Sequence, residues 1–143
     1  FYVPYIQAKL IPASKRKVYH TSMNWEVYPE SIYEMIKKFS HYKKVKELII
    51  TENGAAFHDK ISHGKIDDTE RINYLAQYLN QVKLATLENP KLKGYFVWSL
   101  LDNFEWAEGY HQRFGLVHVD FKTQKRTLKA SAFWFKKFLE NKS

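Results

Sequence analysis

The order of the apolar segments constrains the fold of this chain most strongly. Two short β-rich runs, Leu48–Thr51 and Tyr95–Ser99, alternate with stretches in which apolar residues recur at helical spacing. Strands that alternate with helices predict parallel βαβ units, and short continuous apolar runs are typical of strands buried on both faces. Two strands cannot complete an open sheet or a barrel, so the sequence predicts an α/β segment that resembles the end of a barrel.

Three helices are predicted around these strands. The first opens at Pro29, because proline suits the first helical position. The second begins near Asp68, where acidic and hydroxyl residues mark a helix start, and it ends at Asn89-Pro90. The last helix spans residues 128–140. The predicted order is therefore helix, strand, helix, strand, long loop, helix.

The other segments are predicted to be irregular, apart from a short added strand at Leu116–Val119. Residues 55–66 form a polar loop, and residues 100–115 form a long loop rich in aromatic and carboxylate side chains. Residues 1–27 contain helix-breaking prolines and end in an aromatic stretch. A long aromatic segment of this kind is unusual in a compact domain unless it serves a site.

Composition excludes several classes of protein. The chain has no cysteine, which rules out a disulfide framework, a thiolate zinc site and a cysteine nucleophile. No apolar run approaches the roughly 20 residues that span a bilayer, and Phe1–Tyr5 lacks the features of a signal peptide, so we expect a cytoplasmic protein with no membrane partner. The net charge of +8 comes from lysines spread along the chain, which indicates a solvated surface and no nucleic-acid partner.

Two segments qualify as sites of chemistry, because active residues of βα barrels lie at the carboxyl ends of the strands. One is Thr51–Gly54, directly after the first strand, and the other is Trp98–Trp106, directly after the second. Glu52 could serve there as a nucleophile, a base or a metal ligand, or it could simply cap a turn. The 10 Phe, 10 Tyr and 4 Trp could supply flat platforms for sugar rings or an aromatic core.

Long ordered motifs in these segments resemble glycoside hydrolase family 1, the β-glucosidase family. Ile50–Phe57 is similar to its nucleophile motif, and Gly94–Trp106 is similar to its last barrel strand and sugar-binding loop. The likeness covers nearly everything from residue 21 to the end. It implies that residues 1–143 form the C-terminal part, about the last two βα units, of a single (β/α)8 TIM barrel. It also implies hydrolysis of terminal non-reducing β-glycosides with retention.

The resemblance assigns roles residue by residue. Glu52 matches the catalytic nucleophile, and Trp98 matches the tryptophan at the floor of the sugar pocket. Glu105 matches the carboxylate that accepts hydrogen bonds from the outer sugar hydroxyls. The resemblance matches three further residues to substrate contacts, which are Trp106 beside that carboxylate, Phe114 as an apolar wall and Trp25 at the aglycone entrance.

Less specific roles remain open for several of the same residues. A tryptophan after an apolar strand is usually part of a core, and the aromatic residues of the long loop could simply pack together. Considered as metal ligands, three of the six histidines show no paired ligand spacing, namely His58, His111 and His118. The family implies neither a metal nor another cofactor. Asp102 and Asn103 are predicted to cap or brace the long loop.

One catalytic group of the family is not matched by any residue of this sequence. The family's acid/base lies in an Asn-Glu-Pro motif, and no such tripeptide occurs here. The chain alone is therefore expected to be inactive and to need the N-terminal part of a barrel, or a second copy of itself, as partner. The alternative is a non-catalytic sugar-binding or interaction fragment. Glu105 favours unphosphorylated sugars, because a carboxylate repels phosphate.

Overall fold

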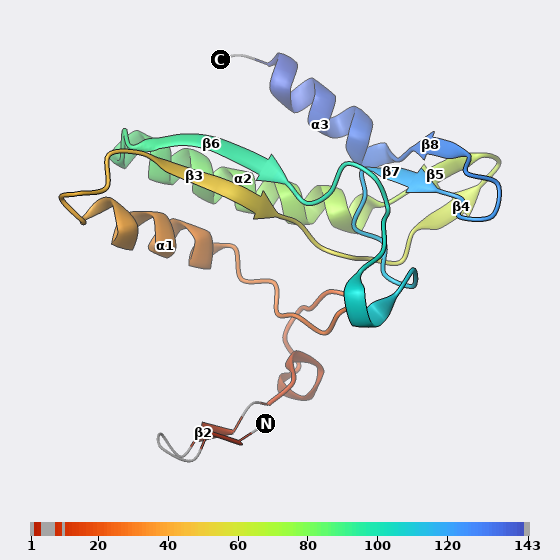
Figure 1. Cartoon of the computed structure of the whole chain (residues 1–143), viewed down its shortest axis with the longest axis horizontal. Coiled ribbons are helices and arrows are strands. Elements are labelled where there is room, and N and C mark those ends of the chain that lie inside the picture. Colours follow the sequence, from red (N-terminus) through yellow and green to blue (C-terminus); the bar gives the residue numbers. More distant parts are fainter. Residues whose placement is uncertain (1, 4–7, 10, 142–143) are drawn as a thin grey trace.

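A computed structural model describes residues 2–3, 8–9 and 11–141, and its centre is a parallel βαβ unit (Figure 1). Strand β3 (Leu48–Asn53) pairs in parallel with β6 (Leu92–Val97), and α2 (Thr69–Glu88) lies between them in sequence. The predicted strand–helix–strand order is confirmed. Both strands differ from their predicted bounds, since β3 continues through Glu52 and β6 ends before Trp98.

The helices cover one face of this two-stranded sheet. Helix α1 (Glu30–Ser40) and α2 pack together, and α3 (Ala130–Glu140) packs against α2. One core cluster joins Ile36, Val82, Ala85 and Leu92, with Leu48 and Ile50 of β3 packed against it. A second cluster joins α2 to the segments that pack against it. It comprises Ala55, Phe57, Tyr74, Leu75, Tyr78, Leu79 and Leu116.

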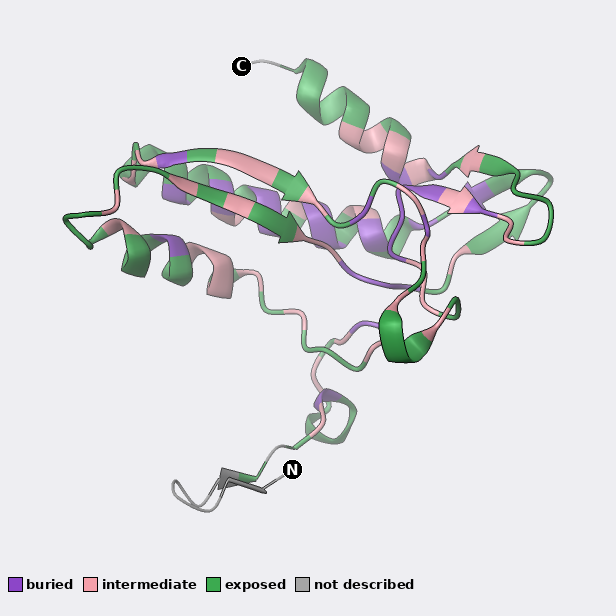
Figure 2. Ribbon diagram, in the orientation of Figure 1, coloured by how far each residue is buried: buried purple, intermediate pink, exposed green. Residues whose placement is uncertain are grey.

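The opposite face of the sheet is open to solvent, so the prediction of strands buried on both faces is wrong for this chain. Ile49 and Phe96 are 54% and 60% exposed, although both lie within strands of the sheet. Figure 2 shows exposed and half-buried residues along both strands. The cause is topological, because the helices that contact the sheet among the described residues all pack on its other face.

Two short hairpins complete the fold beyond the sheet. Strand β4 (Lys60–Ser62) pairs with β5 (Lys65–Asp67), so the predicted polar loop over residues 55–66 is partly wrong. Strand β7 (Val117–Val119) confirms the predicted added strand and pairs with β8 (Arg126–Leu128), which shortens the last helix from its predicted start.

The N-terminal segment is less irregular than predicted. It contains a 3-10 helix, η2 (Ala13–Arg16), and a short pairing of β1 (Tyr2–Val3) with β2 (Ala8–Lys9). Most of Phe1–Tyr5, on which the expectation about a signal peptide rests, lies outside the described residues. No helix in the described part of the chain is both long and apolar enough to cross a bilayer.

Candidate active site

The carboxyl ends of β3 and β6 lie side by side and open onto one cleft. Its volume is about 700 Å³. All six residues singled out from the sequence line it, namely Glu52, Trp98, Glu105, Trp106, Phe114 and Trp25. Six more residues line the cleft without having been given a role of their own, although two of them belong to the predicted segment Thr51–Gly54; they are Thr21, Glu26, Asn53, Gly54, Tyr74 and Tyr78. The fold therefore gathers residues from the aromatic N-terminal segment, both strand ends and the long loop.

Asn53 anchors the end of β3 beside Glu52. Its side-chain oxygen accepts a 2.8 Å hydrogen bond from the Tyr95 hydroxyl, and its Nδ2 donates at 3.1 Å to the hydroxyl of Tyr74. The Tyr74 ring stacks on Tyr78 with 4.2 Å between centroids. Burial raises the pKa of Tyr74 and of Tyr95 far above the ordinary value, so both phenols stay protonated donors. The aromatic core thus fixes the backbone that carries Glu52.

Glu105 and Trp98 are joined directly. The indole Nε1 of Trp98 donates a 3.3 Å hydrogen bond to one carboxylate oxygen of Glu105, Oε1. The Trp98–Ser99 peptide bond is cis. Trp106 opens the 3-10 helix η3 (Trp106–Glu108), and its side chain is 85% exposed at the mouth of the cleft.

Two aromatic side chains that line the cleft lie close to each other. The Phe114 ring is buried and lies 6.0 Å from the ring of Trp25, centroid to centroid, with the planes tilted by 49°. Trp25 itself is half exposed, and its backbone nitrogen donates to the hydroxyl of Thr21. These rings offer apolar surface, and an indole also carries a hydrogen-bond donor, a combination that suits a ligand that is part apolar and part hydroxylated.

The electrostatic environment of Glu105 differs from that of a free carboxyl. Partial burial is the main cause that raises its pKa, and the charges of Asp102 and Glu52 raise it further. Hydrogen bonds from Trp98 and Asn103 act in the opposite direction. The end of β3 and the loop after β6 thus each contribute a carboxylate to the cleft, Glu52 and Glu105.

Asp102 and Asn103 brace the long loop, as predicted. Nδ2 of Asn103 donates to the hydroxyl of Ser99 and to the carbonyl of Leu101, each at 3.1 Å. The fully buried carboxylate of Asp102 accepts a hydrogen bond from the Gly115 nitrogen at 2.9 Å. These bonds hold the two ends of the loop against each other.

Gly54 lies against the backbone of Trp98, where a side chain cannot fit. A Cβ at Gly54 would lie 1.6 Å from the Trp98 carbonyl oxygen, whereas a Cβ at Gly94 would lie 3.4 Å from Ile49. We expect Gly54→Ala to lower the free energy of unfolding by about 3 kcal/mol or more, because the strand ends must move apart. Urea denaturation checks this against Gly94→Ala as the matched control. Equal losses in the two variants would contradict the predicted close approach.

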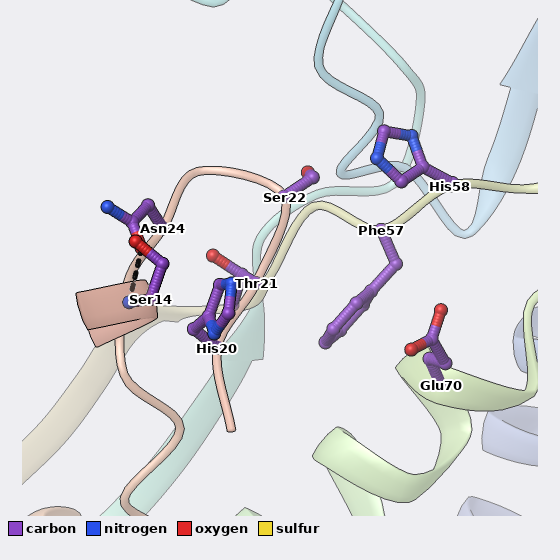
Figure 3. Close-up of a pocket in the computed structure, with 8 residues that line it drawn as sticks. All are labelled: Ser14, His20, Thr21, Ser22, Asn24, Phe57, His58 and Glu70. Carbon is purple, nitrogen blue, oxygen red and sulfur yellow. Dashed lines mark hydrogen bonds between the residues drawn. The ribbon is translucent and has the colours of Figure 1, made fainter. Parts of the chain in front are cut away.

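A second, smaller pocket lies between the N-terminal segment and the start of α2 (Figure 3). Its volume is about 420 Å³, and Thr21 lines both this pocket and the cleft. Glu70 is its single carboxylate, and no tryptophan lines it. The expectation of no metal site stays a prediction, although no group of three potential ligands gathers in the part of the chain described. The pocket thus lacks the paired carboxylates of the larger cleft.

Comparison with known proteins agrees with this architecture. The profile of Glycosyl hydrolase family 1 matches residues 5–143. Beta-glucosidase A of Thermotoga maritima is 50% identical over 128 residues, covering 89% of this chain and 29% of the relative. The 6-phospho-beta-galactosidase of Clostridium acetobutylicum is 44% identical over 118 residues, covering 82% and 25%.

The likeness extends to three dimensions. The family 1 β-glucosidase of Thermotoga maritima, solved in complex with isofagomine lactam, matches with a TM-score of 0.85 and 50% identity over 88% of this chain and 29% of that one. The chain thus spans about 29% of the length of the Thermotoga relative and has the mixed α/β structure of part of its barrel. This chain belongs to glycosyl hydrolase family 1.

Proposed function

We propose that this chain supplies the nucleophile and part of the sugar pocket of a retaining β-glycosidase that removes terminal non-reducing β-D-glucosyl or related residues. In this proposal the chain is the C-terminal part of one (β/α)8 domain. The observation that carries the proposal is the shared cleft, where Glu52 and Glu105 lie among Trp25, Trp98 and Trp106. A carboxylate at the carboxyl end of a strand is well placed for nucleophilic attack, and a second carboxylate among aromatic side chains suits the binding of a sugar.

Glu52 is the proposed nucleophile. A carboxylate oxygen attacks the anomeric carbon, and the bond from that carbon to the leaving-group oxygen breaks. An acid from a segment outside this sequence protonates the leaving oxygen. The same group, now a base, takes a proton from water, which attacks the anomeric carbon and releases Glu52. Retention follows because the carbon is displaced twice.

Glu105 and the surrounding rings are proposed to bind the sugar. Glu105 Oε1 accepts a bond from Trp98, and we propose that the carboxylate also accepts bonds from sugar hydroxyls. Bonds to a charged acceptor are strong, and a site built for a hydroxyl rejects analogues that lack it. The negative charge also disfavours a 6-phosphate. Trp106, Phe114 and Trp25 supply apolar surface along the cleft.

The open face of the sheet indicates the proposed partner. Ile49 and Phe96 are apolar and exposed in mid-strand, and both strands have an unpaired edge among the described residues. We propose that the N-terminal part of a barrel covers this face, because inward-facing side chains of a (β/α)8 barrel form a packed core. A second copy of this chain is the alternative occupant.

The chain alone is expected to show no glycosidase turnover, because it lacks the group that protonates the leaving oxygen and then activates the attacking water. A chimera in which this chain replaces the matching segment of the Thermotoga maritima relative, called here the chimeric barrel, is expected to hydrolyse 4-nitrophenyl β-D-glucoside. We expect the 6-phosphate of that substrate to react more slowly. Turnover by the purified chain alone, or a folded but inactive chimeric barrel, would contradict the proposal.

Sugar affinity is expected to fall on acidification because of Glu105. Burial raises the pKa of this carboxyl above 4.5, and protonation removes its capacity as a charged acceptor. Binding of isofagomine lactam to the chimeric barrel should therefore weaken as the pH falls, with a midpoint above that of an ordinary glutamate. In Glu105→Gln, whose amide does not titrate, this pH dependence of lactam binding should vanish. Calorimetric titrations at several pH values decide, and identical pH profiles in the two proteins would refute the assignment.

A non-catalytic sugar-binding fragment is the second candidate. It would hold if the rest of the barrel carried another residue in place of the acid/base. Binding of isofagomine lactam by the isolated chain, together with a chimeric barrel that binds the lactam but does not hydrolyse glucosides, would support this candidate over the first.

A further inference from the structure

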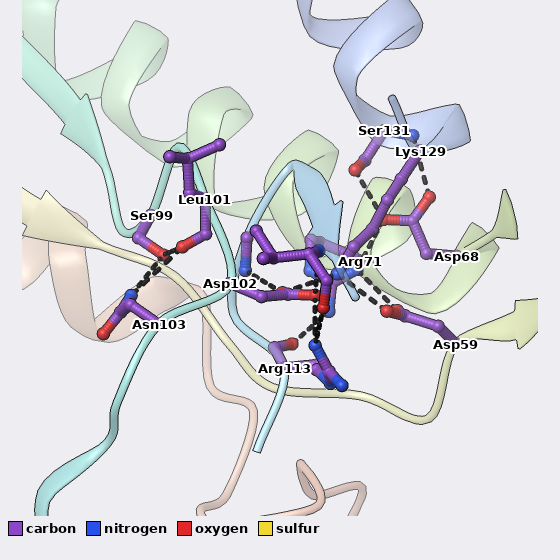
Figure 4. A network of polar contacts seen from close by, with 12 residues as sticks. Asp59, Asp68, Arg71, Ser99, Leu101, Asp102, Asn103, Arg113, Lys129 and Ser131 are labelled. Atoms are coloured by element: carbon purple, nitrogen blue, oxygen red, sulfur yellow. Dashed lines mark hydrogen bonds and ion pairs between the residues drawn. The ribbon is translucent and has the colours of Figure 1, made fainter. Parts of the chain in front are cut away.

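A buried lysine connects the two segments that form the cleft. The ammonium group of Lys129 donates a 2.9 Å hydrogen bond to Asp102 Oδ1, and it lies 2.7 Å from Asp59 Oδ2, an ion pair without good hydrogen-bond geometry (Figure 4). The side chain of Lys129 is completely buried. Asp59 belongs to the segment that follows β3, the strand that carries Glu52, whereas Asp102 belongs to the loop after β6. Lys129 therefore bridges both strand ends from the start of α3.

Arg71 continues the connection to two helix starts. Its Nη1 lies 3.0 Å from Asp59 Oδ1 and 2.5 Å from Asp68 Oδ2, and its Nη2 donates to the carbonyl of Arg113. Asp68 in turn accepts bonds from the backbone nitrogen and hydroxyl of Ser131. The network thus ties the amino ends of α2 and α3 to the loop that follows β6.

The loop depends on Asp102 in a specific way. Besides Lys129 and the Gly115 nitrogen, Asp102 accepts bonds from Arg113 Nη1 at 3.1 Å and from the Val119 nitrogen at 3.4 Å. A Cβ at Gly115 would lie 2.2 Å from the Asp102 nitrogen, so the backbone segments around Gly115 and Asp102 are in close contact. Displacement of Asp102 would therefore shift the loop that carries the cleft residues Glu105 and Phe114.

Stability alone is a weak reason for such a network. It holds three acids, Asp59, Asp68 and Asp102, and three bases, Arg71, Arg113 and Lys129. Buried ion pairs often contribute less to folding than apolar residues of similar size would, because desolvation offsets their attraction. What they supply is a fixed geometry between the groups that they join.

We propose that Lys129 is a positioning residue, which holds the segment after Glu52 and the loop that bears Glu105 in a fixed relation through Asp59 and Asp102. It acts through other residues and does not line the cleft. Its effect on turnover rests on the proposed function, whereas its effect on the loop does not.

Hydrogen exchange of the chain tests the structural part. In Lys129→Met we expect the amides of residues 99–119 to exchange at least about tenfold faster, while the α2 amides change little. Lys136→Met is the matched control, since the Lys136–Glu140 pair is 3.7 Å apart and exposed. Unchanged exchange over residues 99–119, or an equal rise throughout the chain, would overturn the proposal.

A double variant separates positioning from charge balance. Asp59→Asn with Lys129→Met leaves two acids and two bases, so it should fold even where the single variant does not. We still expect faster exchange over residues 99–119, because the bridge to the segment after β3 is lost. Exchange at the parent rate in the double variant would show that Lys129 only neutralises charge.

Kinetics of the chimeric barrel test the link to the cleft. Small displacements of reacting groups can cost about 100-fold in rate, and we expect Lys129→Met to lower kcat/KM by a similar factor. Lys136→Met should retain the parent value. An active parent chimera with unaltered kinetics in Lys129→Met would overturn the positioning role. An inactive parent chimera, with the exchange result as expected, would instead refute the proposed function and leave the role of Lys129 in the loop standing.

Discussion

Glu52→Gln in the chimeric barrel is expected to lower kcat for 4-nitrophenyl β-D-glucoside by about 10⁴-fold or more, because the amide has nearly the same shape but is a very poor nucleophile. Glu52 lines the cleft at the end of β3 and is solvent accessible, so the substitution should leave the fold intact. Steady-state kinetics give the rate, and circular dichroism confirms folding.

The matched control for this variant lies at the other end of the same strand. Glu47 precedes β3 and is exposed, and it does not line the cleft. Glu47→Gln should keep the parent kcat within about twofold, as expected for a surface position remote from the cleft. A Glu52→Gln protein that retained a tenth of the parent rate would show that Glu52 is not the nucleophile.

Asp68→Ala is expected to destabilise the chain by about 3–5 kcal/mol, because it removes one of the two carboxylates that neutralise the buried Arg71 guanidinium. The Asp68 carboxylate is fully buried, and it also accepts bonds from Ser131 that fix the start of α3. The loss should appear in urea denaturation as a lower midpoint.

Breaking the exposed Lys136–Glu140 pair provides the comparison for that loss. Its side chains are 73% and 61% exposed, so Lys136→Met should change the free energy of unfolding by less than about 1 kcal/mol. If Asp68→Ala cost no more than Lys136→Met, the buried Arg71 charge would not depend on Asp68 for compensation.

The central βαβ unit could be predicted because its signals are local. The apolar run at Leu48–Thr51 and the stripe of α2 each lie within one element, and Asn89-Pro90 marks the helix end beside the observed Glu88. The candidate cleft could be predicted for a related reason. Strand ends of parallel βα units share one edge, so residues that follow the strands come together.

The remaining features depend on contacts between distant segments. The β4–β5 hairpin contains two apolar residues, Ile61 and Ile66, among polar ones, so its sequence resembles a loop. Lysine usually lies on the solvated surface, so the burial of Lys129 could not be predicted from its own segment. It pairs there with Asp59 and Asp102, which belong to two other segments. The i, i+3 spacing of Asp68 and Arg71 was a local signal of the network.

Covalent trapping of the nucleophile tests the central claim most directly. The chimeric barrel is incubated with a 2-deoxy-2-fluoro-β-D-glucoside that carries a good leaving group, digested, and mapped by tandem mass spectrometry. A fluoroglucosyl adduct on Glu52, absent from Glu52→Gln, is the result expected if this chain carries the nucleophile of a retaining β-glycosidase. An active chimeric barrel with its adduct on another residue, or with no adduct, would contradict that assignment.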